Sequence, residues 1–165
     1  MNATLLLRVL LAIACCVVVP RAFAAEECTV STTGVNCGTY DPTSGTAVTA
    51  QGTIEVLCRG NALTVTIGIG TGGSNSYANR RMTDGTTNLF YNLYTTAART
   101  TIFGDGTGGS STVSCTTGVT SNGCTGDNPS GSDRRAIRPV YGLMPASQAA
   151  GPGTYTDTLT YSVTF

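Results

Sequence analysis

Residues 154–165 alternate strictly between small hydroxyl side chains and larger ones. Thr or Ser fills every second position, and the positions between carry Tyr155, Asp157, Leu159, Tyr161, Val163 and Phe165. Because successive side chains of a strand point to opposite faces, this pattern predicts an amphipathic β-strand. Such a strand needs main-chain partners along its edges and cover over its apolar face. The sequence ends on this strand, so we expect one edge to lack a following strand.

Alternation of the same kind recurs upstream. Residues 53–58 and 63–69 flank a turn signal at Arg59-Gly60-Asn61 and together predict a β-hairpin. Residues 88–94, 100–103 and 136–143 predict further strands, and Pro139 would confine the last one to a sheet edge or a bulge. Residues 116–132 are a polar stretch without apolar periodicity, which predicts a loop.

Helical periodicity is absent after residue 25, because no segment repeats its apolar residues every 3.6 positions. Low charge and many Gly and Thr residues favour short strands joined by tight turns. We therefore expect an all-β protein, with two packed antiparallel sheets forming a β-sandwich with Greek-key-like connections.

The N-terminal segment has the layout of a secretory signal peptide. An apolar run at residues 9–19 is followed by Pro20 and by Ala22-Phe23-Ala24, which suits a cleavage site. A transmembrane anchor is the alternative, but the run is far shorter than the ~20 residues that a span requires. We predict a signal peptide at residues 1–24 and one secreted domain at residues 25–165.

Charge and composition narrow the function classes. The 165 residues carry nine basic and nine acidic side chains, and His, Lys and Trp are all absent. A nearly neutral chain without basic runs argues against a nucleic-acid partner, because phosphate binding depends on positive charge. Missing His removes the commonest general base and metal ligand. We therefore expect no enzyme, no catalytic residue, no cofactor and no metal site.

Two segments with acidic residues are candidates for ligand binding or acid–base chemistry. The segment FGDGTGG at residues 103–109 lacks the Lys and helix of a phosphate loop, and it has one carboxylate where a calcium loop needs several oxygens. Asp127 and Asp133 lie in a polar stretch with nothing to raise a pKa. Both segments are interpreted as solvated, turn-rich connections.

The cysteines suggest a disulfide framework, since secretion leads to an oxidising compartment. A bond between Cys115 and Cys124 would staple the short loop between them. A bond between Cys28 and Cys58 would pin the N-terminal segment to a strand. Cys37 would then be left over, either as a small buried hydrophobe or as a thiol for another chain.

Several stretches together resemble one known family. They are CTVSTTGVNCGTYDP (28–42), GTIEVLC (52–58), YNLYTTAARTTIFGDGTGG (91–109), VYGLMPASQ (140–148) and GTYTDTLTYSVTF (153–165). They resemble the spore coat protein U (SCPU) domain family, which includes pilins of archaic chaperone–usher systems. The family's bond between an early Cys and the Cys ending the second strand maps onto Cys28 and Cys58. Cys37 replaces the aromatic residue that usually precedes GTY, which favours a buried thiol there.

This resemblance implies an incomplete immunoglobulin-like sandwich that lacks its last strand. A periplasmic chaperone would lend a strand, and an outer-membrane usher would exchange it for the extension of a neighbouring pilin subunit. The donor-strand groove and chaperone-binding site would lie beside Leu159, Tyr161, Val163 and Phe165. The expected function is a secreted structural subunit of a pilus or fibre in surface attachment and biofilm formation. Its place would be the cell surface of a Gram-negative bacterium, reached through the periplasm.

One feature departs from a polymerising pilin. Cleavage before Ala25 leaves only Ala25-Glu26-Glu27 ahead of Cys28, whereas a donor extension needs roughly ten residues to span a sheet at ~3.3 Å each. We therefore expect a subunit that accepts a strand without donating one, as a tip would. The alternative is an autonomous secreted coat, matrix or surface-binding β-sandwich module that completes its own fold.

Overall fold

The computed structural model describes residues 27–165, so the predicted signal peptide at residues 1–24 lies outside the described residues. This part of the chain contains no α-helix and only one short 3-10 turn, η1 (Gly72–Ser74). The ten strands are β1 (Cys28–Thr33), β2 (Val48–Arg59), β3 (Thr64–Ile69), β4 (Arg81–Thr83), β5 (Asn88–Phe90), β6 (Asn92–Tyr94), β7 (Val113–Thr116), β8 (Thr125–Asp127), β9 (Asp133–Met144) and β10 (Tyr161–Thr164).

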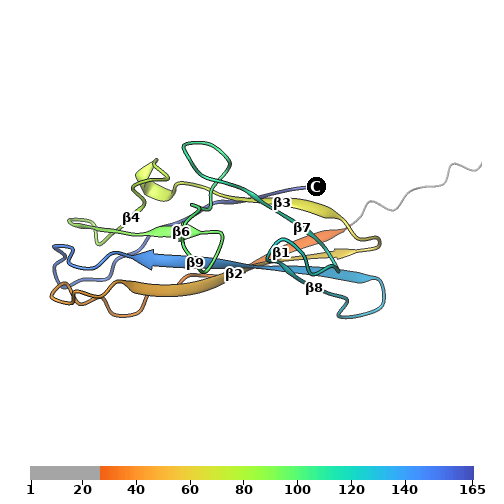
Figure 1. Ribbon diagram of the computed structural model, residues 1–165, viewed down its shortest axis with the longest axis horizontal. Helices are drawn as coiled ribbons and strands as arrows, with labels where there is room; N and C mark the ends of the chain where they lie inside the picture. Colours follow the sequence, from red (N-terminus) through yellow and green to blue (C-terminus); the bar gives the residue numbers. More distant parts are fainter. Residues whose placement is uncertain (1–26) are drawn as a thin grey trace, which may run out of the picture.

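Two sheets form the body of the molecule (Figure 1). The larger sheet has the order β1-β2-β9-β6, and β8 pairs with β9 beyond the end of β6. The smaller sheet has the order β10-β3-β7, and β4 pairs with β5 in a separate short hairpin. Every strand pairing is antiparallel. The predicted all-β antiparallel sandwich is confirmed.

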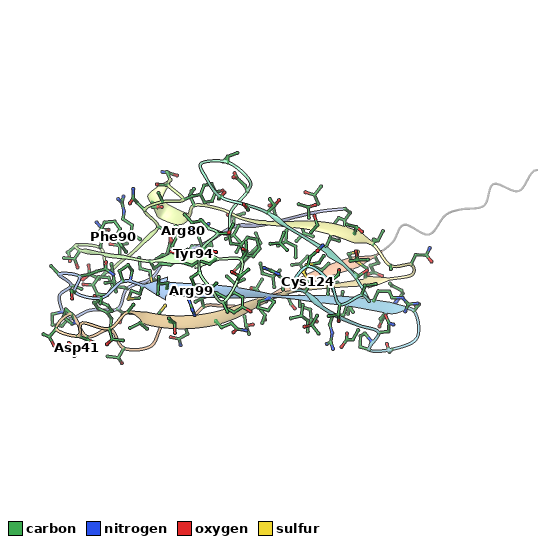
Figure 2. The ribbon with its side chains drawn as sticks, viewed as in Figure 1. Asp41, Arg80, Phe90, Tyr94, Arg99 and Cys124 are labelled. Carbon is green, nitrogen blue, oxygen red and sulfur yellow. A yellow bond between two sulfur atoms is a disulfide. The ribbon has the colours of Figure 1, made fainter. Side chains whose placement is uncertain are left out.

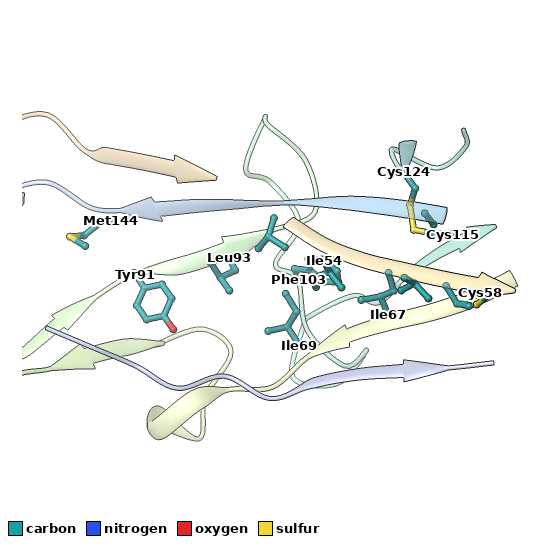
Figure 3. Close-up of a cluster of buried hydrophobic side chains, with 14 of the residues drawn as sticks. Ile54, Cys58, Ile67, Ile69, Tyr91, Leu93, Phe103, Cys115, Cys124 and Met144 are labelled. Atoms are coloured by element: carbon teal, nitrogen blue, oxygen red, sulfur yellow. A yellow bond between two sulfur atoms is a disulfide. The ribbon is translucent and has the colours of Figure 1, made fainter. Parts of the chain in front are cut away.

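The core lies between these sheets because each long strand turns one row of side chains inward. On β2 the inward row is Ile54, Val56 and Cys58, and on β3 it is Val65, Ile67 and Ile69, all fully buried. Figure 3 shows Ile54 from β2 and Ile67 and Ile69 from β3 in the same cluster, with Leu93 and Phe103 beside them. The strict alternation of the sequence thus becomes one apolar layer.

The predicted hairpin of residues 53–58 and 63–69 is wrong. Both segments are strands, but β2 pairs with β1 and β9, whereas β3 pairs with β7 and β10 in the other sheet. The turn at Gly60 carries the chain from one layer to the next, so the two apolar rows face each other across the core. Local alternation is the same in either arrangement, and only distant partners distinguish them.

Strand β9 is central rather than an edge. Pro139 pairs with Thr53 on the β2 side, while on the other side β8 reaches residues 135–137 and β6 reaches residues 141–143. Pro139 therefore sits where that flank has a gap, which is how a central strand tolerates a residue without an N–H. The predicted strand at 88–94 divides at Tyr91 into β5 and β6, and β8 lies inside the predicted loop at 116–132.

Two arginines are buried inside the sandwich. Arg80 donates to the carbonyls of Gly70 (2.8 Å) and Phe103 (2.7 Å) and to the side chain of Asn92 (2.9 Å). Arg138 lies on the inward face of β9 and donates to the carbonyl oxygens of Asn122 and Thr95. Since main-chain oxygens replace water around each cation, the guanidinium groups fasten loops to the core. Arg80, labelled in Figure 2, is fully buried.

Candidate functional site

Two strands border one open side of the sandwich. β10 pairs with β3 along one edge, and β1 pairs with β2 along one edge. Within residues 27–165, the second edge of each strand has no strand partner. An unpaired edge presents a row of free N–H and C=O groups, which can pair with another extended segment.

Apolar side chains on the inward faces of these edge strands remain exposed. Val30 on β1 pairs with the buried Val56, so it faces the core, yet it is 43% exposed. Tyr161 and Val163 on β10 pair with Ile69 and Ile67 and are only half-buried. Phe165 continues the same row and is 63% exposed. The second sheet therefore does not cover β1, and the core is open between the two edges.

The structure brings three of the four predicted groove residues together on the core. Leu159, Tyr161 and Val163 are partly buried and pack against the apolar cluster from its margin, whereas Phe165 projects beyond it. The regular strand is shorter than the sequence pattern, because residues 157–160 have no strand pairing. In Figure 1 the chain reaches its C-terminal end beside β3.

A cleft of about 870 Å³ lies at the other end of this open side. One wall is formed by residues 34–40 and Pro42, which follow β1, and the other by residues 150–157, which precede β10. Met82, Leu89 and Met144 line it between these walls. Sequence reasoning missed this cleft, because its walls are far apart in the chain and the pattern along one segment does not show what lies opposite it.

The cleft wall is held by specific hydrogen bonds. The Tyr40 hydroxyl donates to the carbonyl of Pro145 (3.0 Å) and accepts from the N–H of Gln148 (2.7 Å). The Gln148 side chain in turn accepts from the N–H of Phe90 (2.7 Å) and donates to its carbonyl (2.9 Å). These bonds tie Tyr40 in the cleft wall to the segment after β9, and that segment to the end of β5.

Cys37 lines the cleft as a free, half-buried thiol. Burial raises the pKa of this thiol. At neutral pH the side chain is therefore protonated and weakly nucleophilic. Its position makes it a natural reporter for anything that enters the cleft.

The other four described cysteines form two disulfides. Cys28 and Cys58 are joined, and they are also register partners on β1 and β2. Cys115 and Cys124 are joined across the loop between β7 and β8. The first bond fastens the edge strand β1 to the core strand β2, and so it lies at one end of the open side.

Asp105 lies in a local turn as expected, but Asp127 ends β8 and Asp133 begins β9, so the interpretation of that segment as a loop is wrong for these two residues. Asp105 accepts from the N–H and the hydroxyl of Thr107, and Asp127 pairs with Arg135. Asp133 pairs with Arg59 (3.4 Å) and accepts from Ser130. Hydrogen bonds from Thr107 and Arg135 lower the pKa values of Asp105 and Asp127, respectively, and the Ser130 hydroxyl contributes most to lowering that of Asp133. No group of three His, Cys, Asp or Glu side chains suited to a metal ion occurs in the described part of the chain.

Among residues 27–165, no helix has the length and apolar character needed to cross a bilayer.

The sequence matches the model of the Spore Coat Protein U domain over residues 13–162. The match spans most of the chain, so the chain belongs to this family, and the resemblance inferred from the motifs is confirmed. No curated protein matches the sequence significantly.

Among solved structures, the fold is similar to that of a chain in the crystal structure of the CsuC–CsuE chaperone–tip adhesion subunit pre-assembly complex. This complex comes from the archaic chaperone–usher Csu pili of Acinetobacter baumannii, and the TM-score is 0.58 with 18% sequence identity. The similarity covers 86% of this chain and 40% of that chain, so this chain spans less than half of its length. At this identity the likeness establishes a shared fold.

Proposed function

We propose that this protein is a structural subunit of a chaperone–usher pilus or fibre that accepts a β-strand from another polypeptide. One observation carries the proposal: inward-facing apolar side chains stay exposed at two free strand edges, at Val30 (43%) and Phe165 (63%). Membership of the SCPU family and the fold shared with a chain of a chaperone–subunit complex support it. An added strand would satisfy the free main-chain groups and cover these side chains.

The proposed partners follow from this chemistry. A periplasmic chaperone would donate the strand first, an outer-membrane usher would exchange it, and a neighbouring pilin subunit would supply the final strand. The mature fibre would stand on the surface of a Gram-negative bacterium and act in attachment and biofilm formation. No step of this assembly requires catalysis by the subunit, so we do not assign it an enzymatic activity.

We further propose an accepting-only role at the fibre tip. This part rests on the expected cleavage before Ala25, which leaves two acidic residues and one Ala ahead of Cys28. Mass spectrometry of the mature N-terminus tests it. A mature chain that starts ten or more residues before Ala25 would possess a donor segment, and the tip assignment would be abandoned.

The central experiment expresses the mature chain alone and with a chaperone encoded near its gene. Alone, the chain should be unstable and prone to aggregate, because the open side exposes apolar surface. With the chaperone it should co-purify as a soluble complex. A free chain that is as soluble and as stable as the complex would support the autonomous module and contradict the proposal.

Substitutions along β10 and the segment before it identify the interface. Leu159→Asp, Tyr161→Asp and Phe165→Asp should each abolish co-purification, because burying an unpaired carboxylate is costly. Thr164→Asp is the matched control, since Thr164 is exposed and alternates to the outward face of the same strand. If the three inward variants co-purify with the chaperone in normal yield, this surface is not the interface.

A further inference from the structure

A carboxylate interrupts the apolar row that borders the open side. Asp157 alternates with Tyr155, Leu159 and Tyr161, so it occupies an inward-facing position of an otherwise apolar series. It is half-buried and lines the cleft at the point where the cleft meets the free edge. A charged group in such a place requires hydrogen-bond partners.

Two donors hold this carboxylate. The Tyr91 hydroxyl donates to Oδ2 of Asp157 (2.6 Å), and the N–H of Gly73 donates to Oδ1 (3.0 Å). Tyr91 is buried, and burial together with the neighbouring carboxylate raises its pKa well above the usual range. The hydroxyl therefore keeps its proton and acts as the donor.

The backbone beneath is shaped for the carboxylate. Gly72 has φ +68°, a conformation that favours glycine, and a Cβ at this position would overlap the Asp157 carboxylate. In Figure 3 the labelled Tyr91 directs its hydroxyl away from Met144, toward the strand that leads to the C-terminus.

Asp157 also acts where main-chain pairing is sparse. Thr156 exchanges two main-chain hydrogen bonds with Thr83 (3.0 and 3.1 Å), and the carbonyl of Thr160 accepts from Gly70 (2.8 Å). Between these points the chain has no strand pairing, and continuous pairing begins only at Tyr161. The side chain of Asp157 therefore supplies the hydrogen bonds within this interval, where Leu159 contributes apolar packing.

We propose that Asp157 is a positioning residue for strand acceptance, and that Tyr91 and Gly73 fix its carboxylate so that the start of the free edge has one position. A partner strand would then meet an edge that is already aligned with β3 and with the cleft. We call the Asp157 carboxylate with its two donors, the Tyr91 hydroxyl and the Gly73 N–H, the latch. The inference deepens the proposed function and rests on it for its purpose, whereas the latch itself is a property of this chain.

Hydrogen–deuterium exchange tests the latch on whichever form is isolated, the chaperone complex or the free chain. In Asp157→Ala, amides of residues 159–164 should exchange about tenfold faster or more, since a hydrogen bond to a charged group is lost. Amides of residues 54–57 and 136–140 should be unchanged. Tyr91→Phe, which keeps the ring, should give a smaller effect at the same amides.

Two further variants sharpen the result. In the double variant Asp157→Ala with Tyr91→Phe, amides of residues 159–164 should exchange no faster than in Asp157→Ala alone. Both substitutions remove the same hydrogen bond between Tyr91 and Asp157, so their effects should not add. Asp127→Asn, which alters a carboxylate on the opposite sheet, should leave these amides unchanged. If exchange became faster across the whole chain, Asp157 would be a general stabiliser, which would contradict the inference. If exchange became faster in neither single variant, the latch would not exist.

Strand acceptance provides the separate readout. With the latch disturbed, the chaperone complex should form several-fold more slowly, whereas Thr164→Asp should not slow it. If the wild-type chain forms no complex, the proposed function fails while the exchange result still decides the latch. If the complex forms at the wild-type rate in Asp157→Ala despite faster exchange, the latch exists but does not serve acceptance, and the inference is overturned.

Discussion

Val30 and Val56 are the same residue type, lie directly opposite each other on neighbouring strands and face the same layer. Val56 is completely buried, whereas Val30 is 43% exposed. The difference is what lies above them: the inward row of β3 packs over that of β2, whereas the side chain of Val30 on β1 is left partly uncovered. The same contrast separates Ile67 from its half-buried partner Val163 on β10. Burial here depends on where a strand lies in the two layers and not on residue type. The open side therefore results from how the strands are arranged in the two sheets.

The largest expected effect concerns the bond that fastens the open edge to the closed core. Replacing Cys28 and Cys58 by Ser should lower the free energy of unfolding by about 3–4 kcal/mol, because the bond closes a loop of some thirty residues. Urea unfolding measures this. The bond between Cys115 and Cys124 serves as the matched control. It closes a shorter loop, so its removal should lower the free energy of unfolding by about 2.6 kcal/mol. Equal stability with and without Cys28–Cys58 would mean that β1 is held by its main-chain bonds alone.

The valine pair tests the comparison directly. Val56→Ala should cost about 2 kcal/mol of unfolding free energy, since it removes buried methyl groups and leaves a cavity. Val30→Ala should change the stability of the unpartnered chain by less than about 0.5 kcal/mol. In the chaperone complex Val30→Ala should become destabilising as well. A large cost for Val30→Ala in the free chain would show that the open side is already covered there.

Cys37 tests whether a partner also fills the cleft. Its alkylation by a maleimide should slow by about tenfold or more when the strand donor binds, because the thiol becomes inaccessible. In the free chain the rate should keep rising with pH beyond about 8.5, where an ordinary thiol is already half ionised, because burial raises its pKa. Unchanged labelling in the complex would confine the partner to the β1 and β10 edges.

The smallest effect concerns the exposed turn that follows β4. Hydrogen bonds from the N–H groups of Thr87 and Thr86 hold the pKa of Asp84 well below its usual range. A lowered pKa stabilises the fold above the unfolded value of about 4, and this contribution is lost as the pH falls below it. The melting-temperature difference between wild type and Asp84→Asn should therefore be constant above about pH 5 and shrink toward pH 2. A melting-temperature difference that stays constant down to pH 2 would contradict a stabilising role of the ionised Asp84 carboxylate.

Much of the fold could be predicted because alternation is local. Residues 53–58, 63–69 and 136–143 are strands as predicted, and Tyr161 and Val163 lie on the inward face. The pairing of residues 53–58 with 63–69 was wrong, since alternation does not say whether two strands share a sheet or face each other across the core. Short strands such as β4 and β8 have too few residues to show a period, and their pairing with β5 and β9 defines them.

By itself, the sequence determined the strand character of the chain, the inward and outward rows and the family, because these depend on residue order alone. The tertiary structure decided which rows are covered. It also brought residues 34–42 and 150–157 together as one cleft, and it supplied Asp157 with Tyr91 and Gly73 as partners. These features join segments that lie far apart in the chain, and pairing over such distances depends on how the two sheets stack.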